Sequence, residues 1–269
     1  MKVSGMCISG LVIFLLIFSS TVYAEGNLVG YWAFDADSEF EDSSGEDNHG
    51  TAENGAAIDG DGKFGGCAVF DGTDDYVECP SSDSLNPTGE ITLMCWFSAA
   101  EGGLNEQKPL ILKSFTAHAD PYYQYGLFAI DKAGSPKGVY FYIAIDGTWH
   151  HDCAKNDAGY DYDEWHHLAG TYDGSEIKLY FDGEEVASET APGEISSYDT
   201  PLLFGAYANL DKTDVYCFGG KIDEVAILDA ALGANEIKRI MESGVRNTLL
   251  AVDSRGKLAT LWGETKAAR

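Results

Sequence analysis

The sequence predicts an all-β protein, an antiparallel sandwich of two sheets with one short helix near the C-terminus. Short runs of β-branched and aromatic residues alternate with turns along most of the 269 residues. Asp-Gly pairs at Asp71, Asp146, Asp173 and Asp182 favour tight hairpins, because glycine accepts positive φ and aspartate bonds its own backbone. Many short strands separated by such turns are typical of a sandwich or a barrel.

The N-terminus has the features of an export signal over residues 1–24. Lys2 supplies a positive start, an apolar run extends over 8–18, and Val22-Tyr23-Ala24 resembles a cleavage site. The apolar run is shorter than the roughly 20 helical residues that cross a bilayer, although an uncleaved anchor is the alternative. Because no other long apolar segment follows, we expect a secreted or cell-surface protein that does not enter the membrane after signal removal.

The predicted strands belong to one domain over residues 25–245, because the chain shows no repeat or Pro-rich linker. In the run 177–181, Ile177, Leu179 and Phe181 alternate with Lys178 and Tyr180, so the two sets face opposite sides. The expected strands are 28–34, 68–70, 76–79, 91–97, 110–113, 125–130, 139–145, 166–172, 177–181, 185–188, 202–204 and 218–228.

A helix is expected over residues 234–242, where Ile237, Ile240 and Met241 recur at helical spacing before Gly244. The basic tail, residues 246–269, is predicted to form a hairpin with strands over 249–252 and 258–262. Two interpretations remain for this tail: strands docked on the acidic body, or an anchoring or sorting appendage.

The chain is strongly acidic, with 44 Asp and Glu against 17 Lys and Arg and a net charge of -27. Nucleic acid is a poor partner, because its binding needs cations that neutralise phosphates. Such acidity indicates either solubility through self-repulsion or carboxylates that chelate a hard cation such as calcium.

Five cysteines remain after the predicted signal. An exported protein can form disulfides, but five thiols leave at least one unpaired. The pair flanking the turn at Asp71, Cys67 with Cys79, is the favoured bridge, although sequence alone does not define connectivity. The five are Cys67, Cys79, Cys95, Cys153 and Cys217.

Seven segments in order resemble the laminin-G-like jelly roll of the concanavalin-A-like lectin/glucanase superfamily, over about residues 28–242. The segments are 28–35, 42–50, 70–77, 91–97, 164–174, 179–183 and 219–225. The resemblance implies a jelly-roll topology for the predicted sandwich. Because this fold carries lectins, hydrolases and adhesion modules, it implies the fold more strongly than the function. Trp32, Trp96 and Trp165 lie within apolar runs and are expected in the core.

Relatives in this superfamily often hold a structural calcium between an early loop and the last strand. The resemblance suggests Asp42, Asn48 and Asp223 as its ligands, since calcium takes about six to eight oxygen ligands. The alternative is ordinary turn capping by Asp42 and Asn48. The Asp59-Gly60-Asp61-Gly62 stretch departs from the EF-hand pattern and is expected to be a turn.

A carbohydrate site needs an aromatic ring for stacking and polar groups for the hydroxyls. Two aromatic-rich regions, 149–163 and 122–125, have that composition, and Trp149 follows a turn, where exposure is expected. The alternative is that these aromatics pack loops onto a sheet. The candidate ligand-binding residues are Trp149, His151, Asp152, Tyr160, Tyr162 and Tyr123.

No catalytic residues are predicted. Asp223 and Glu224 are adjacent, so an ideal strand points them to opposite faces and they cannot work together. Neither a Gly-x-Ser-x-Gly elbow nor an HExxH frame is present. The sequence therefore favours a secreted, non-catalytic module that binds carbohydrate or a glycoprotein, with a structural calcium. The alternatives are an extracellular protein–protein adhesion module and, less favoured, a glycoside hydrolase.

Overall fold

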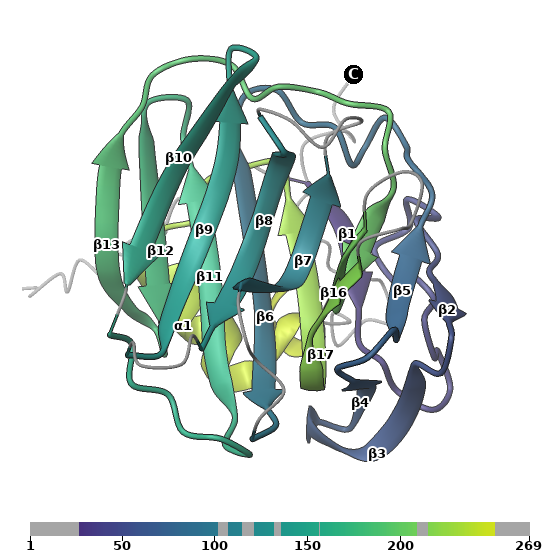
Figure 1. Ribbon diagram of the computed structural model, residues 1–269. Coiled ribbons are helices and arrows are strands. Elements are labelled where there is room, and N and C mark those ends of the chain that lie inside the picture. Colours follow the sequence, from purple (N-terminus) through teal and green to yellow (C-terminus); the bar gives the residue numbers. More distant parts are fainter. Residues whose placement is uncertain are drawn as a thin grey trace, which may run out of the picture.

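The strands of the computed structural model lie in two large antiparallel sheets packed face to face, which confirms the predicted all-β sandwich (Figure 1). The structure describes residues 27–101, 107–114, 121–131, 136–155, 157–208 and 215–250. The predicted signal at residues 1–24 lies outside these ranges, as does most of the predicted tail hairpin. No helix in the described ranges is long and apolar enough to cross a membrane.

The first sheet has eight strands in the order β13-β12-β11-β6-β17-β4-β3, with β1 paired to β17. Its strands are β1 Leu28–Trp32, β3 Ala57–Phe64, β4 Gly66–Asp71, β6 Ile91–Ala99, β11 His166–Tyr172, β12 Glu176–Phe181, β13 Glu184–Thr190 and β17 Gly219–Leu228. The predicted meander over β11, β12 and β13 is confirmed, with hairpin turns at Gly174 and Gly183 that have φ of 87° and 80°.

The second sheet has seven strands in the order β10-β9-β8-β7-β14-β5-β2. They are β2 Thr51–Glu53, β5 Tyr76–Cys79, β7 Gln107–Ser114, β8 Tyr123–Ile130, β9 Gly138–Ile145, β10 Thr148–Lys155 and β14 Leu202–Phe204. A small two-stranded sheet joins β15 Ala206–Ala208 to β16 Val215–Cys217.

The main core lies between the two large sheets and follows the period-two pattern of the strands. In β12, Ile177 and Leu179 are buried in this core and Phe181 packs against it, while Tyr180 belongs to a separate cluster on the outer face. The sheets approach closely at Gly170, where an added Cβ would lie 2.4 Å from the Phe141 ring. The alternation predicted for residues 177–181 of β12 is therefore confirmed.

Two helices cover part of the outer face of the eight-stranded sheet, on the side away from the seven-stranded sheet (Figure 1). Helix α1, Ala234–Ser243, agrees with the prediction and buries Ile237 and Ile240. A second helix, α2, Val245–Leu249, was not predicted and replaces the expected start of a tail strand at Leu249. Its apolar Val245 and Leu249 recur at helical spacing and are buried against the sheet, which favours a helix over an exposed hairpin.

The predicted Cys67–Cys79 disulfide does not form in this structure. All five described cysteines are buried, and no disulfide joins them in the described structure. Cys67 lies on β4 of one sheet and Cys79 on β5 of the other, because the chain changes sheets at the turn that follows Asp71. The turn that was expected to close a hairpin within one sheet is a connection between the sheets, so the pairing argument does not apply.

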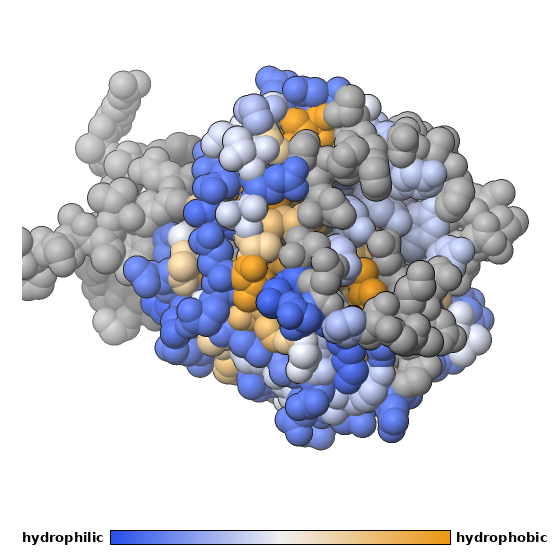
Figure 2. Space-filling view, turned by 60° about the vertical axis from the view of Figure 1, so that its left-hand side comes forward, coloured by the Kyte–Doolittle hydropathy of each residue, from blue (hydrophilic) through white to orange (hydrophobic). Residues whose placement is uncertain are grey.

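The surface agrees with the acidic composition. On the side of the molecule near β13, hydrophilic residues cover most of the described surface, and hydrophobic residues are exposed in several patches between them (Figure 2). Of the large hydrophobic side chains described, Tyr216 alone is classed as exposed, at 38%. A hydrophilic surface of this kind is solvated. We therefore expect a binding site at individual pockets and side-chain clusters.

Candidate functional site

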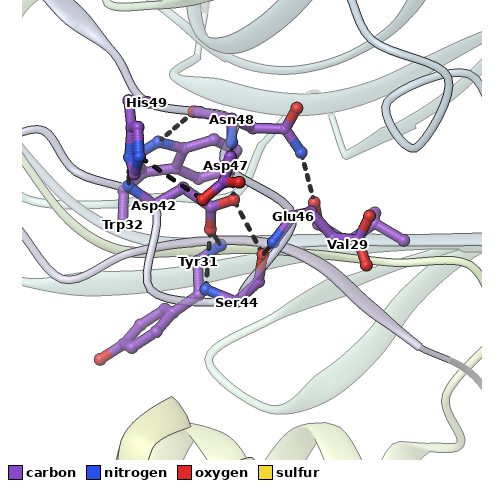
Figure 3. Close-up of polar contacts among 9 residues, drawn as sticks. All are labelled: Val29, Tyr31, Trp32, Asp42, Ser44, Glu46, Asp47, Asn48 and His49. Carbon is purple, nitrogen blue, oxygen red and sulfur yellow. Dashed lines mark hydrogen bonds and ion pairs between the residues drawn. The ribbon is translucent and has the colours of Figure 1, made fainter.

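Asp42 organises the loop that follows β1 (Figure 3). Its Oδ1 accepts hydrogen bonds from the backbone N–H of Tyr31 at 2.9 Å and of Ser44 at 2.8 Å. Its Oδ2 accepts from the Ser44 hydroxyl at 2.8 Å and from the Asn48 N–H at 3.0 Å. A carboxylate has about four acceptor sites, so these bonds occupy all of them. This geometry matches the turn-capping alternative.

Asn48 is similarly engaged. Its side-chain nitrogen donates to the Val29 carbonyl at 2.8 Å and to the Ser84 hydroxyl at 3.0 Å, and its side-chain oxygen accepts from the Ser82 hydroxyl at 2.6 Å. Its carbonyl accepts from the Trp32 indole at 3.1 Å. Asp42 and Asn48 therefore lie together, as predicted, but a calcium ion would have to replace hydrogen bonds already made at both side chains.

Asp223, the third predicted metal ligand, has hydrogen-bond partners on β3 and β17, away from the loop of Asp42 and Asn48. Its carboxylate accepts from the backbone N–H of Phe64 at 2.9 Å and of Glu224 at 2.6 Å. Its side chain is fully buried, and burial raises its pKa to about 8. None of its described hydrogen bonds is shared with Asp42 or Asn48, so calcium at this trio stays a prediction.

The expectation that Asp223 and Glu224 face opposite sides of the sheet is wrong. Ile222 and Val225 both belong to the inter-sheet core, so the two acids between them lie on the outer face. A bulge in β17 between Asp223 and Ala226, with Glu224 at φ 50°, causes this arrangement. Glu224 accepts from the Tyr31 hydroxyl and from Val245 N–H. Glu224 is 4% exposed, so neither acid opens onto a cleft.

A different acidic group, not predicted as a metal site, follows β4. Ligand oxygens of Asp71, Asp74 and Asp75 lie within 4.8 Å of one another. Asp75 is buried, and burial together with its acidic neighbours raises its pKa. The sequence Asp-Gly-Thr-Asp-Asp at residues 71–75 could have indicated a metal site. The Asp-Gly pair predicts a turn there, and the turn accounts for the same residues.

An aromatic cluster lies on the outer face of the seven-stranded sheet, and we call it the tyrosine face. Tyr123 is at its centre, with ring centroids 5.3 Å from Phe128, 5.6 Å from Tyr142 and 5.7 Å from Tyr207. Burial and the neighbouring phenols raise the pKa of Tyr123. The tyrosine face consists of Tyr122, Tyr123, Phe128, Tyr140, Tyr142, Tyr207 and Tyr216.

The tyrosine face includes one predicted ligand residue, Tyr123, and is next to another. In the register of β10 with β9, Asp152 pairs with Tyr142 and His151 with Ile143. The backbone of Asp152 therefore lies beside the tyrosine face. The side chains of Trp149, His151 and Asp152 lie outside the described part of the structure. Sequence reasoning missed Tyr140 and Tyr142, although their alternation in one strand signals a shared face.

Two other predicted ligand residues lie elsewhere. Tyr160 is 1% exposed, packs on Phe97, and donates its hydroxyl to the Ile130 carbonyl at 3.0 Å. It is a core residue, and its ring cannot stack on a ligand. Tyr162 donates to Asp131, and the Lys137 ammonium lies 3.3 Å from its ring centroid. These contacts match the loop-packing alternative. Tyr123 and Asp131 are at opposite ends of β8, so Tyr162 is not part of the tyrosine face.

The three tryptophans expected in the core occupy different environments. Trp32 is fully buried in the core, as predicted. Trp96 is buried on the outer face, against Phe64, His167 and the Lys63 ammonium. Trp165 is only half-buried and lines a pocket of about 360 Å³, which corrects its assignment to the core. Trp165 precedes β11 and lies at the surface of the sheet. A strand pattern could not predict whether other residues bury it there.

A family model described as the concanavalin A-like lectin/glucanases superfamily matches residues 71–238, more than half of the chain. The chain belongs to this superfamily. The match confirms the laminin-G-like resemblance, and the two antiparallel sheets are the sandwich that the superfamily assignment requires. No curated protein sequence matches the chain.

Solved structures with the same fold include several binding domains. Domain 4 of AbnA, a GH43 extracellular arabinanase from Geobacillus stearothermophilus in complex with arabinotriose, aligns with TM-score 0.61 and 20% identity, over 80% of this chain and 98% of that one. The binding domain of Paraclostridial Mosquitocidal Protein 1 aligns with TM-score 0.61 and 17% identity, over 86% and 55%.

A further similar structure is the botulinum neurotoxin serotype D ligand binding domain in complex with N-acetylneuraminic acid. It aligns with TM-score 0.60 and 12% identity, over 83% of this chain and 52% of that one. This superfamily member thus spans about half the length of the toxin domains that it matches. At these identities the similarity establishes the fold alone.

Proposed function

We propose that this chain is an exported, non-catalytic module that binds carbohydrate, free or on a glycoprotein, at the tyrosine face. The observation that carries the proposal is the tyrosine face itself. Tyr122, Tyr123 and Tyr140 are half-buried and Tyr216 is exposed, so rings with hydroxyl groups meet the surface within one cluster. Such rings can stack on the apolar face of a sugar, while their hydroxyls contact its hydroxyl groups.

The similar structures support a carbohydrate as the partner. One of them is in complex with arabinotriose and another with N-acetylneuraminic acid. The strongly negative chain, at -27, favours a neutral glycan over an acidic one, because like charges repel. Export is proposed from the predicted signal at residues 1–24.

The arrangement of the carboxylates supports binding without catalysis. A glycoside hydrolase needs two carboxylates about 5–10 Å apart in an open cleft. Asp223 and Glu224 share a face, but both are buried beneath other elements and bonded to Phe64, Tyr31 and Val245. Hydrolysis assays with the glycans that bind best should therefore show no product.

A structural calcium, expected from the superfamily resemblance, is kept as part of this proposal. Calcium prefers carboxylate and carbonyl oxygens. The predicted ligands are Asp42, Asn48 and Asp223, and the alternative donors are Asp71, Asp74 and Asp75. The resident ion would join segments of the sandwich; it has no role in a chemical step.

The proposal is tested by glycan-array screening, followed by titration calorimetry on the glycans retained. Tyr123→Ala should weaken binding at least tenfold. The control is Tyr162→Ala, at a half-buried tyrosine whose partner Asp131 follows the far end of β8, and it should leave affinity within twofold. Circular dichroism would check that both variants fold. If Tyr123→Ala binds like the wild type, the tyrosine face is not the site. If the array retains no glycan, a protein partner becomes the better hypothesis.

A further inference from the structure

The pocket beside Trp165 lies on the opposite sheet from the tyrosine face. The register places Val69 of β4, Lys221 of β17 and Ser98 of β6 in one row across three neighbouring strands. The neighbouring row, Ala68, Ile222 and Phe97, belongs to the inter-sheet core, so the Val69 row faces outward. The pocket is thus on the outer face of the eight-stranded sheet.

Small residues between larger neighbours create this pocket. Ser98, Ala100 and Gly220 line it together with the larger Trp165, Asp61 and Phe70. Gly220 has φ 142°, and an added Cβ would lie 2.2 Å from the Ser98 carbonyl oxygen, so only glycine fits there. The volume of about 360 Å³ is within the range of small-ligand sites, roughly 300–1,000 Å³.

Trp165 differs from the other tryptophans whose side chains are described. The Trp32 indole donates to the Asn48 carbonyl, and Trp96 is enclosed by Phe64, His167 and Lys63. Trp165 is half-buried and has no ring contact or side-chain hydrogen bond among the described residues. A large apolar ring that lines a pocket and stacks on no other ring is a suitable platform for a ligand.

The polar groups of the pocket define the ligand chemistry. The Lys221 ammonium lies 3.1 Å from an Asp59 oxygen and 3.9 Å from an Asp61 oxygen, and it donates to the Asp61 carbonyl at 3.3 Å. Its charge is therefore balanced, and the exposed Asp163 adds a further negative charge. An anion would be repelled by the aspartates, whereas the hydroxyl groups of a neutral ligand could donate to these carboxylates and accept from Lys221.

We propose that this pocket is a second carbohydrate site, which binds a neutral saccharide stacked on Trp165. Carboxylates of Asp61 and Asp163 accept hydrogen bonds from sugar hydroxyls, and Lys221 donates to them. The site is independent of the tyrosine face, because the two lie on the outer faces of different sheets. A chain with both sites can cross-link two glycan chains.

Affinity electrophoresis in gels that contain arabinan, xylan, galactan, mannan or β-glucan tests the proposal. We expect at least one polysaccharide to retard the wild type, Trp165→Ala to weaken that binding at least tenfold, and Trp165→Phe to keep most of it. The Trp165 variants are compared in a Tyr123→Ala background, in which the tyrosine face does not contribute to the retardation, and this separates the two sites. Equal retardation of Trp165→Ala and wild type on every gel, or no retardation of the wild type, would overturn the proposal.

Hydroxyl-radical footprinting of the wild type gives a readout that does not depend on a variant. The retained polysaccharide, supplied as its trisaccharide, should reduce oxidation of Trp165 by at least twofold. Tyr216 on β16 serves as the internal comparison, since it is an exposed aromatic side chain of the tyrosine face. Protection of Tyr216 with unchanged oxidation of Trp165 would assign binding to the tyrosine face and contradict the second site.

Discussion

Tyr31 donates its phenolic hydrogen to the carboxylate of Glu224, and the same carboxylate accepts the Val245 N–H. Glu224 therefore connects β1, the bulge in β17 and the start of α2 at one buried point. Burial is the main reason that the pKa of Glu224 is raised, although its hydrogen bonds oppose the shift. This contact positions the C-terminal helices on the outer face of the eight-stranded sheet.

Removing the Tyr31 hydroxyl should destabilise the protein. Tyr31→Phe leaves the buried Glu224 carboxylate with one donor fewer, which costs about 1–3 kcal/mol. Urea unfolding followed by circular dichroism measures the change. Tyr216→Phe, at an exposed tyrosine, should change stability by less than about 0.5 kcal/mol. Equal effects of the two substitutions would contradict the role of the Tyr31 contact.

His167 should make stability depend on pH in the acidic range. It is buried against Trp96, and burial lowers its pKa to about 4, whereas the unfolded value is near 6.5. The unfolded chain therefore binds more protons than the folded chain between these values. The stabilisation is complete above about pH 6.5 and is lost as pH falls towards 4, by roughly 1.4 kcal/mol per pH unit.

The measurement compares urea unfolding of the wild type and His167→Phe between pH 7 and pH 4.5. The difference in stability should shift in favour of the variant as the pH falls. Gly60→Ala changes no titratable group and should follow the wild-type slope. If His167→Phe also follows that slope, the buried imidazole is not the group that titrates.

Replacing Asp42 distinguishes capping from calcium ligation. Asp42→Asn removes acceptors for Ser44 and Asn48, which should cost about 1–3 kcal/mol. Capping alone predicts the same fall in melting temperature in EDTA and in millimolar calcium. A fall seen only with calcium would identify Asp42 as a ligand. Loss of a calcium-dependent rise in Asp71→Asn would instead locate the ion at the aspartates after β4.

The close approach of the sheets at Gly170 should not tolerate a methyl group. Gly170→Ala places Cβ 2.4 Å from the Phe141 ring, and overpacking of this kind typically costs about 1–3 kcal/mol. Gly60→Ala is the matched control, because an added Cβ there has no heavy atom within 4 Å. Thermal unfolding should separate the two variants, and similar melting temperatures would show that the sheets can move apart at this point.

The cysteines should react only after unfolding. All five described cysteines are buried and outside any described disulfide. Burial raises the pKa of Cys67 and Cys217 to about 11, so little of either thiol is ionised near neutrality. Titration with Ellman's reagent should find none of them reactive in the native protein. In urea all five should react. A smaller number in urea would reveal a disulfide and contradict this prediction.

The sequence by itself determined the fold class and most of the strands. Period-two alternation and Asp-Gly turns are local signals, which is why the meander of β11 to β13 agrees with expectation. The helical spacing of apolar residues is also local and predicted helix α1. The seven ordered segments also identified the superfamily, since each reflects a strand or a turn that the fold requires. Tyr123 could be selected because its neighbours in sequence are aromatic.

Only the tertiary structure decided how these elements combine. The turn after Asp71 joins two sheets, so Cys67 and Cys79 are separated. A bulge turns Asp223 and Glu224 to one face, which no ideal alternation can predict. Whether an aromatic ring is buried, as at Tyr160, or lines a pocket, as at Trp165, depends on distant strands. The solvent exposure of a side chain depends on residues that are distant in the sequence, so a local sequence pattern cannot predict it.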